Sequence, residues 1–141
     1  VTGLDVVTQA RIVRLLLNLR DHFGLSILLI SHDLPLVARV ADQLLVMYGG
    51  RFVETGPTTA VTSSPRHPYT RQLLGAFPTV RGPRRQLVAI RGEPPDPLQL
   101  PSGCPFHPRC PAVLPECRHA ELSLEERAPG HRAACLLDEH R

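Results

Sequence analysis

The distribution of proline constrains the fold of this chain more than any other feature, because it divides the sequence at Gly56. Of the 15 prolines among 141 residues, 14 follow Gly56. Proline fixes φ and lacks a backbone N–H donor, so it interrupts helices and central strands. Regular helices and strands are therefore expected in residues 1–56, and loops, short helices and extended segments in residues 57–141.

The N-terminal part of the chain begins with a helical pattern. Apolar residues recur with i, i+3, i+4 spacing between Ile12 and Phe23, which is typical of an amphipathic helix. Asp5 is suited to cap the start of this helix, and Gly24 is suited to end it. We therefore expect one helix between these two residues.

Residues 25–54 then predict a strand, a helix and a hairpin. Residues 25–30 are apolar except for Ser26 and show no alternation, a pattern typical of a strand covered on both faces in a parallel sheet. Asp33 can cap a second helix that reaches about residue 41. Two strands, 43–48 and 51–54, flank the turn signal Gly49-Gly50. The fold class predicted for this part is α/β, the end of a doubly wound sheet closed by an antiparallel hairpin.

The segment after Gly56 contains fewer elements. Short helices are expected at 58–63 and 68–76, the second with Pro68 at its first position, and a strand is a candidate at 86–91. So few large apolar side chains follow that this segment cannot bury enough surface to be stable unaided. A stabilising cross-link, either a disulfide or a bound metal, is therefore expected in this segment.

Composition excludes several classes of function. All 16 basic residues are arginine, so no site here uses a phosphate-loop, Schiff-base or kinase-type lysine. The net charge of +3 is spread without a basic stripe, and only six aromatic residues are present, which argues against nucleic-acid binding. The apolar run 27–30 is far shorter than the about 20 residues of a membrane span.

The first residues carry no secretory signal, because they are neither basic nor a long apolar stretch. The single methionine is Met47. We expect the chain to be a fragment of a longer protein or a shortened gene product.

Three segments in order carry a family resemblance. They are Thr2-Gly3-Leu4-Asp5, then Ser31-His32-Asp33 after the apolar run, and the hairpin with its Glu54-Thr55-Gly56 ending. Together they resemble the end of an ABC-transporter ATPase domain, which has a P-loop NTPase sheet. The resemblance implies that Asp5 lies in the D-loop and that His32 is the switch histidine of the H-loop. Without it, Asp5 is by default a helix cap and His32 a hydrogen-bonded loop residue.

The tail narrows the resemblance to one subfamily. Residues 65–74, which include His67-Pro68-Tyr69-Thr70, and the cysteine-bearing residues 101–111 resemble the C-terminal elements of dipeptide and oligopeptide importers. The implied domains are residues 1–56, the C-terminal part of the ATPase core, and residues 57–141, an oligopeptide-transporter-type C-terminal domain.

The resemblance implies a function for the complete protein. It would bind ATP and Mg²⁺ between two head-to-tail ATPase subunits of a homo- or heterodimer, with His32 at the γ-phosphate and Asp5 across the dimer interface. Hydrolysis would drive peptide import through transmembrane permease subunits. A peptide-binding protein would be an indirect partner, because it would deliver peptide to the permease subunits. The ATPase subunit would lie at the cytoplasmic face of a bacterial membrane. The Walker A, signature and Walker B motifs are missing from these 141 residues, so this chain alone is expected to be inert toward ATP.

Four cysteines are candidate metal ligands: Cys104, Cys110, Cys117 and Cys135. Without a secretory signal, metal binding is favoured over disulfides. Structural zinc sites usually contain two close cysteine pairs, which this spacing lacks, whereas four thiolates can hold a 4Fe–4S cluster. The family resembled includes members with such a cluster in this element. A 4Fe–4S cluster is therefore favoured, with zinc as the alternative and His107, His119 and His131 as reserve zinc ligands.

Two other classes of protein remain open at this point. One is a free-standing metal- or iron–sulfur-binding regulatory module without ATPase function. The other is a secreted protein stapled by two disulfides.

Overall fold

A computed structural model describes residues 6–76 and 90–137 of the chain. The chain divides into two compact units, Val1–Ala41 and Asp42–Arg141. Asp5 and most of the strand candidate at 86–91 lie outside the described residues, and Ile90 and Arg91 are not in a strand.

The first unit contains two helices, and both were predicted from their end signals. Helix α1 (Val6–Phe23) ends at Gly24, whose φ of 64° lets the N–H of Leu25 donate to the carbonyl of Arg20 at 3.0 Å. Helix α2 (Leu34–Val40) is capped by Asp33, whose side chain accepts a hydrogen bond from a first-turn N–H. Both arrangements satisfy backbone groups that a helix end otherwise leaves unpaired.

The predicted strand at residues 25–30 is wrong for this structure. The segment has no regular secondary structure, and Leu28 and Ile30 are 83% and 88% exposed. A strand of a parallel sheet requires hydrogen-bonded neighbours and helices that cover its faces. Among the described residues no strand pairs with this segment, so its apolar character alone does not make it a strand.

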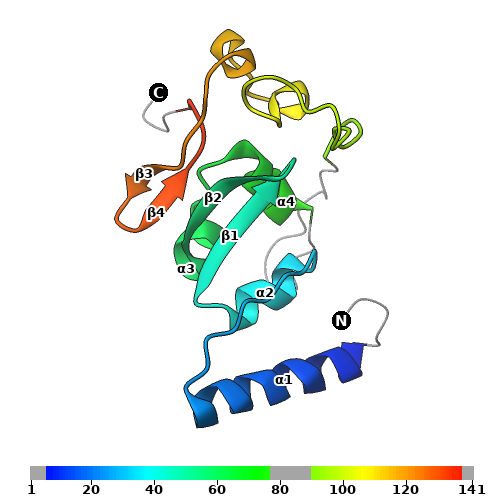
Figure 1. The fold of residues 1–141 in the computed structure, drawn as a ribbon, viewed down its shortest axis with the longest axis vertical. Coiled ribbons are helices and arrows are strands. Elements are labelled where there is room, and N and C mark those ends of the chain that lie inside the picture. The colour runs from blue at the N-terminus through cyan, green and yellow to red at the C-terminus, as the bar shows by residue number, and fades with distance from the viewer. Residues whose placement is uncertain (1–5, 77–89, 138–141) are drawn as a thin grey trace. The chain divides into compact units, whose positions relative to one another are not determined.

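The second unit is built around a four-stranded antiparallel sheet of order β1-β2-β4-β3 (Figure 1). The strands are β1 (Gln43–Tyr48), β2 (Arg51–Pro57), β3 (Glu125–Ala128) and β4 (His131–Ala133). The predicted β1–β2 hairpin is confirmed, and Gly49 and Gly50 turn it with φ values of 53° and 72°. Positive φ at both turn positions matches the twist of the flanking strands. The α/β class is therefore confirmed, with an antiparallel sheet.

The sheet joins segments that are far apart in the sequence. Strand β4 pairs with β2, with Glu54 opposite Ala133 and Thr55 opposite Arg132. Strand β2 also runs through residue 56, where the sequence analysis placed a domain boundary. The C-terminal residues of the chain therefore extend the same sheet as the hairpin.

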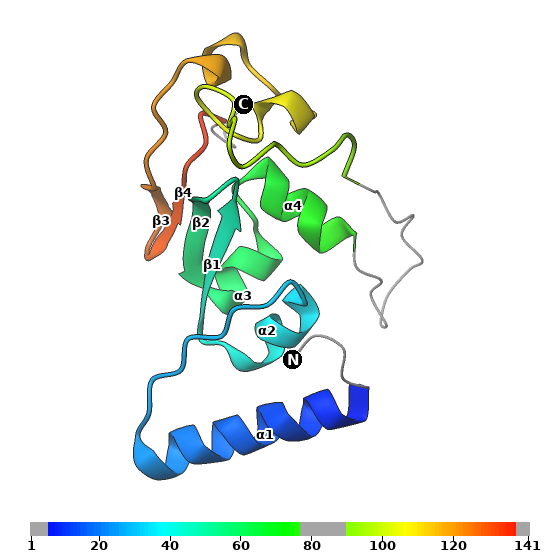
Figure 2. The ribbon, with the colours of Figure 1, turned by 45° about the vertical axis from the view of Figure 1, so that its right-hand side comes forward.

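Short helices complete the second unit. Helices α3 (Thr58–Ser63) and α4 (Pro68–Gly75) confirm the two predicted ones, and two 3-10 helices, η1 (His107–Arg109) and η2 (Pro115–Arg118), lie in the cysteine-bearing loops. Helix α3 packs against the β1–β2 hairpin (Figure 2). Helix α4 contacts β1 through Tyr69 and Tyr48, whose ring centroids are 4.6 Å apart. Among the described helices none combines the length and apolarity needed to cross a membrane.

Candidate functional site

The four cysteines lie in the second unit, around the two 3-10 helices and after strand β4. Cys104 precedes η1, Cys110 follows it, Cys117 lies within η2, and Cys135 follows β4. All four are free thiols, and all except the half-buried Cys110 are buried. Buried thiols of this number form a soft donor set, which suits zinc or iron–sulfur centres.

A glycine turn holds the first and third of these cysteines together. The N–H of Cys104 donates to the carbonyl of Cys117 at 2.9 Å, and the Ser102 hydroxyl donates to the carbonyl of Arg118 at 2.8 Å. Between them, Gly103 has a φ of 67°, and a Cβ atom there would lie 2.3 Å from the Cys117 oxygen. Only glycine fits this close approach, so the Pro-Ser-Gly-Cys sequence specifies the contact between the two loops.

The thiols influence one another electrostatically. Burial raises the pKa of Cys104, Cys110 and Cys135, and negative charge on neighbouring cysteines raises each pKa further. For Cys135 these neighbours are the other three cysteines. Each of these three thiols therefore lies close enough to at least one other cysteine for their charges to interact.

Backbone N–H groups oppose this effect by pointing at the sulfur atoms. Hydrogen bonds to the sulfur lower the pKa of each of these three thiols, although burial has the larger influence. An N–H donor stabilises a thiolate more than a thiol, but burial dominates, so the net effect in the metal-free chain favours the protonated thiol. The donors are Phe106 and His107 at Cys104, Ala112 at Cys110, and Leu137 at Cys135.

The predicted metal site is not arranged around a single ion. In the residues that the structure describes, no group of three or more histidine, cysteine, aspartate or glutamate side chains is placed to hold a metal ion. Tetrahedral zinc with Zn–S bonds of about 2.3 Å requires sulfur atoms about 3.8 Å apart. The four thiols therefore do not form a closed zinc site in the described part of the chain.

An aromatic cluster fastens the first cysteine loop to the sheet. Phe106, two residues after Cys104, is fully buried, and its ring centroid lies 5.1 Å from that of Tyr48 on β1 and 5.3 Å from that of Tyr69 on α4. Such contacts add to the energy gained by burying the rings themselves. The loop that carries Cys104 is thus positioned by the core.

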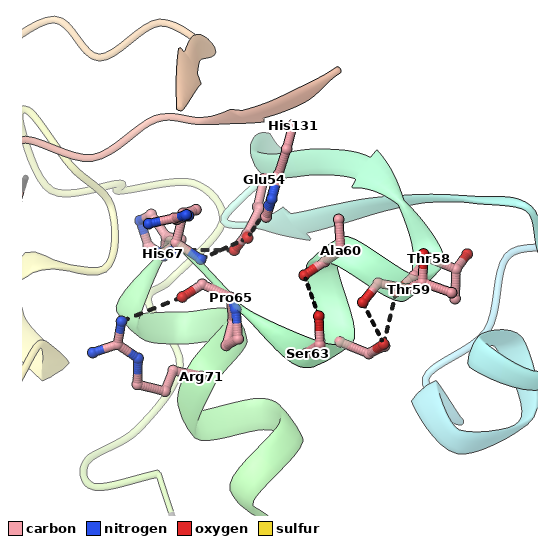
Figure 3. A network of polar contacts seen from close by, with 11 residues as sticks. Glu54, Thr58, Thr59, Ala60, Ser63, Pro65, His67, Arg71 and His131 are labelled. Atoms are coloured by element: carbon pink, nitrogen blue, oxygen red, sulfur yellow. Dashed lines mark hydrogen bonds and ion pairs between the residues drawn. The ribbon is translucent and has the colours of Figure 1, made fainter. Parts of the chain in front are cut away.

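A buried carboxylate links three segments near this loop (Figure 3). Glu54 of β2 is 0% exposed, and its Oε1 accepts from His131 Nε2 and from the N–H of Arg66, each at 2.7 Å. Its Oε2 accepts from the N–H of His67 at 2.9 Å. Three donors offset the cost of burying a carboxylate, and they tie β4 and the start of α4 to β2.

His67 connects this carboxylate to the cysteines. Its ring is 1% exposed, its Nδ1 accepts from the N–H of Tyr69 at 3.1 Å, and its Nε2 lies 3.9 Å from the sulfur of Cys104. Burial lowers the pKa of His67 to about 4, although the carboxylate of Glu54 opposes that change. The imidazole is therefore neutral at physiological pH.

Glu54 and His67 were not predicted to be site residues. The available signal was the His-Pro-Tyr segment, which was interpreted as a helix start with proline in its first turn. That interpretation is correct, because His67 is the N-cap of α4. The further contacts of His67 depend on residues 13 positions before it and 37 after it, which no local pattern reveals.

The reserve zinc ligands have other partners or face solvent. His131 bonds to Glu54, and the ring of His107 lies 2.9 Å through Nδ1 from the carbonyl of Cys104. His119 is exposed. The zinc alternative therefore gains no histidine ligand from these contacts.

His32, the predicted catalytic histidine, lies in the first unit, apart in sequence from the cysteines of the second. Its side chain is exposed, and its carbonyl accepts from the N–H of Leu34 at 3.2 Å, just before α2. Next to it, the Ser31 hydroxyl accepts from the N–H of Asp33 at 3.0 Å. His32 is accessible to a ligand, and Asp5, its predicted partner in catalysis, lies outside the described residues.

Comparison with known proteins gives one family and a set of relatives. Residues 53–117 match the family described as "Oligopeptide/dipeptide transporter, C-terminal region". The chain is 42% identical over 137 residues to the dipeptide transport ATP-binding protein DppF of Haemophilus influenzae, covering 96% of this chain and 42% of that protein. It is 45% identical over 135 residues to the oligopeptide transport ATP-binding protein OppD of Escherichia coli, covering 96% of this chain and 40% of that protein.

A third relative is longer. The chain is 46% identical over 139 residues to the oligopeptide transport ATP-binding protein OppD of Mycobacterium tuberculosis, covering 98% of this chain and 23% of that protein. The chain thus spans about two fifths of the length of the first two relatives and a smaller share of the third.

Proposed function

The chain belongs to the oligopeptide/dipeptide transporter family of ATP-binding proteins, and from that membership we propose that it forms the C-terminal part of the ATP-hydrolysing subunit of a bacterial peptide importer. The observation that carries this proposal is 42–46% identity to such subunits over 95–98% of the chain. A free-standing regulatory module gains no support from relatives of this kind.

In this proposal the chain has two parts. Residues 1–56 are the end of a P-loop ATPase core, and residues 57–141 are the C-terminal domain of the subfamily. The exposure of Leu28 and Ile30 supports the first assignment, because large apolar side chains in an unbroken run are costly to leave in water. In the longer protein this run would be covered by other parts of the ATPase core.

His32 and Asp5 take their roles from the family resemblance. A neutral imidazole has one donor and one acceptor nitrogen, so His32 can hydrogen bond both to a γ-phosphate oxygen and to the attacking water. Its exposed position at the start of α2 is compatible with such contacts. Phosphoryl transfer requires mainly positioning and charge stabilisation of this kind. Asp5 would act at the interface with a second ATPase subunit, where ATP and Mg²⁺ bind.

The partners and location follow from the same proposal. They are a second ATPase subunit, the transmembrane permease subunits and, indirectly, a peptide-binding protein. The subunit would be attached peripherally to the cytoplasmic face of the membrane.

We further propose that the four cysteines hold a 4Fe–4S cluster, with zinc as the alternative. The donor type suits this group, since all four cysteines are free and cysteine thiolates are the ligands of such clusters. When bound, the cluster would act as a structural staple for a tail with few large apolar residues.

Iron and zinc analysis of the chain, prepared without oxygen, tests the metal proposal. We expect a brown protein with iron and inorganic sulfide and broad absorption near ~400 nm, as cysteine-ligated clusters show. A colourless protein with one zinc and no iron would reject the cluster in favour of zinc.

A chimera tests the transport proposal. This chain would replace the matching C-terminal segment of the Escherichia coli OppD relative, and ATP hydrolysis and oligopeptide uptake would be measured with the permease subunits. We expect both activities to be retained. In the chimera with His32→Ala, turnover should fall by about one to three orders of magnitude while apparent ATP affinity barely changes. A folded chimera that assembles but neither hydrolyses ATP nor transports peptide would contradict the proposal, and an unchanged turnover in His32→Ala would reject the catalytic role.

A further inference from the structure

The side chain of Arg109 joins three segments of the second unit. It extends from the last residue of η1, and its Nη1 donates to the hydroxyl of Tyr48 at the end of β1, at 3.1 Å. The other donors of its guanidinium bond to three consecutive backbone carbonyls. Nε donates to the carbonyl of Arg91 at 2.8 Å, and Nη2 donates to those of Ile90 at 3.3 Å and Gly92 at 2.8 Å.

The planar fork of an arginine suits this arrangement. These contacts use four of the five N–H donors of the guanidinium, which point in fixed directions within one plane. The backbone turns at Gly92, whose φ is 73°, and a Cβ atom there would lie 3.7 Å from Arg109 Cγ. A lysine presents its donors on a single nitrogen atom, so it cannot span the same set of acceptors.

The same part of the chain packs against the turn of the hairpin. A Cβ atom at Gly49 would lie 3.1 Å from Pro105 Cβ and 3.3 Å from Leu100 Cδ2. The guanidinium carbon of Arg109 lies 6.0 Å from the ring centroid of the buried Tyr48, within the range of a cation–π contact. Apolar packing thus holds residues 100–105 on the hairpin, and Arg109 extends the attachment to residues 90–92.

We propose that Arg109 is a latch that holds residues 90–92, the entry to the cysteine-bearing segment, against the β1–β2 hairpin. These residues have no regular secondary structure, and Arg91 and Gly92 are exposed, so the side chain of Arg109 supplies the attachment that a strand or helix would otherwise give. In the transporter subunit the latch would make the C-terminal domain move together with the hairpin of the ATPase core. That consequence rests on the proposed function, whereas the latch itself does not.

Limited digestion with trypsin tests the latch directly, because trypsin cleaves after arginine and Arg91 precedes the latched bond. Cleavage requires the backbone to open locally, so its initial rate reports the population of the open form. In the full metal-free chain we expect Arg109→Gln to accelerate cleavage after Arg91 about tenfold, since hydrogen bonds to a charged donor are lost. Cleavage after Arg132, which is exposed but paired on both sides within the sheet, serves as the internal reference and should change by less than about twofold.

Two further variants separate the fork from its charge and from general effects of removing an arginine. Arg109→Lys keeps the positive charge but loses the fork, and it should accelerate cleavage after Arg91 nearly as much as Arg109→Gln does. Arg118→Gln removes an exposed arginine of η2 and should leave the rate at Arg91 unchanged. Mass spectrometry of the earliest fragments gives the rate at each site.

Three results would overturn the inference. Equal rates at Arg91 in the wild type and Arg109→Gln would show that the bonds do not restrain this segment. Equal acceleration at Arg91 and Arg132 would make Arg109 a general stabiliser of the unit and not a latch. A wild-type rate in Arg109→Lys would show that charge alone is sufficient. The digestion involves neither ATP nor metal nor transport, so its failure leaves the proposed function untouched, and an inactive chimera leaves the latch untouched.

Discussion

Glu54 shows how one buried side chain can depend on three separate segments of the sequence. Its carboxylate accepts hydrogen bonds from His131, from the N–H of Arg66 and from the N–H of His67. In Glu54→Ala these donors lose their acceptor in a buried place, and each unsatisfied donor costs about 1–3 kcal/mol. We expect the free energy of unfolding to fall by about 3 kcal/mol or more in urea denaturation.

Glu121→Ala is the matched control for this prediction, because Glu121 is exposed. Substitution of an exposed residue of this kind changes stability by about 0.5 kcal/mol or less. A loss in Glu54→Ala no larger than in Glu121→Ala would contradict the proposed importance of the buried carboxylate.

The pKa of His67 predicts a pH dependence of stability in the metal-free chain. Its pKa is lowered by burial from 6.5 to about 4 in the folded state. As the pH falls from about 6.5 to about 4, the unfolded chain therefore binds a proton at this histidine that the folded chain does not, and stability is lost. The contribution is fully present above pH 6.5 and amounts to about 3 kcal/mol.

Thermal unfolding at a series of pH values measures this effect. In His67→Gln the decline in stability between pH 6.5 and 4 should be smaller than in the wild type. His119→Gln removes an exposed histidine and should leave the decline unchanged. Parallel pH profiles for the wild type and His67→Gln would refute the prediction.

Among the structural elements, the turn at residues 101–104 depends on a single glycine. Gly103 has a φ of 67°, and a Cβ atom there would lie 2.3 Å from the carbonyl oxygen of Cys117. In Gly103→Ala the new Cβ must therefore push the loops of Cys104 and Cys117 apart. The left-handed backbone at an alanine also destabilises the fold by about 1–2 kcal/mol. We expect lower thermal stability and a clear loss of metal uptake.

Gly130→Ala is the matched control for this turn. Gly130 has a φ of 70°, and nothing lies within 4 Å of its missing Cβ, so only the backbone cost applies. We would measure the iron content and the melting temperature of both variants. A larger loss in Gly103→Ala than in Gly130→Ala reports the clash with Cys117, because the backbone effect is common to both. If both variants lost equal stability and took up equal amounts of iron, the close approach of Gly103 to the Cys117 carbonyl would not matter for stability or metal uptake.

Elements marked by local signals were predictable from the sequence, and elements defined by distant partners were not. Asp33 caps α2, Pro68 opens α4, and Gly49-Gly50 turns the hairpin, and each signal acts within a few residues. Strands β3 and β4 are short and were not predicted, because their pairing with each other and with β2 is what makes them strands. Residues 25–30 show the converse, since their apolar run has no partner strand in the described residues.

The same distinction holds for the candidate site. The four cysteines were predicted as one metal site from their spacing and from the family resemblance, and that site stays a prediction. The surrounding contacts could not be predicted, because Cys104 meets Cys117 through a turn and His67 meets Cys104 across 37 positions of sequence. The assignment of His32 and Asp5 rested on family resemblance, and it stays a prediction.

At the scale of the whole molecule, the 141-residue chain should not bind ATP appreciably. In P-loop enzymes the phosphates are held by a glycine-rich loop of backbone N–H groups and by its lysine, and this chain contains no lysine. His32 alone offers one or two hydrogen bonds, each worth about 1.5–3 kcal/mol when the acceptor is charged. That energy hardly exceeds the about 4 kcal/mol that corresponds to a dissociation constant of 1 mM, before the cost of association is subtracted.

Titration with a fluorescent ATP analogue should therefore show no saturation at micromolar concentrations. The intact Escherichia coli OppD relative serves as the positive control. Low-micromolar, magnesium-dependent binding by this chain would contradict the prediction and would place a complete nucleotide site within these 141 residues.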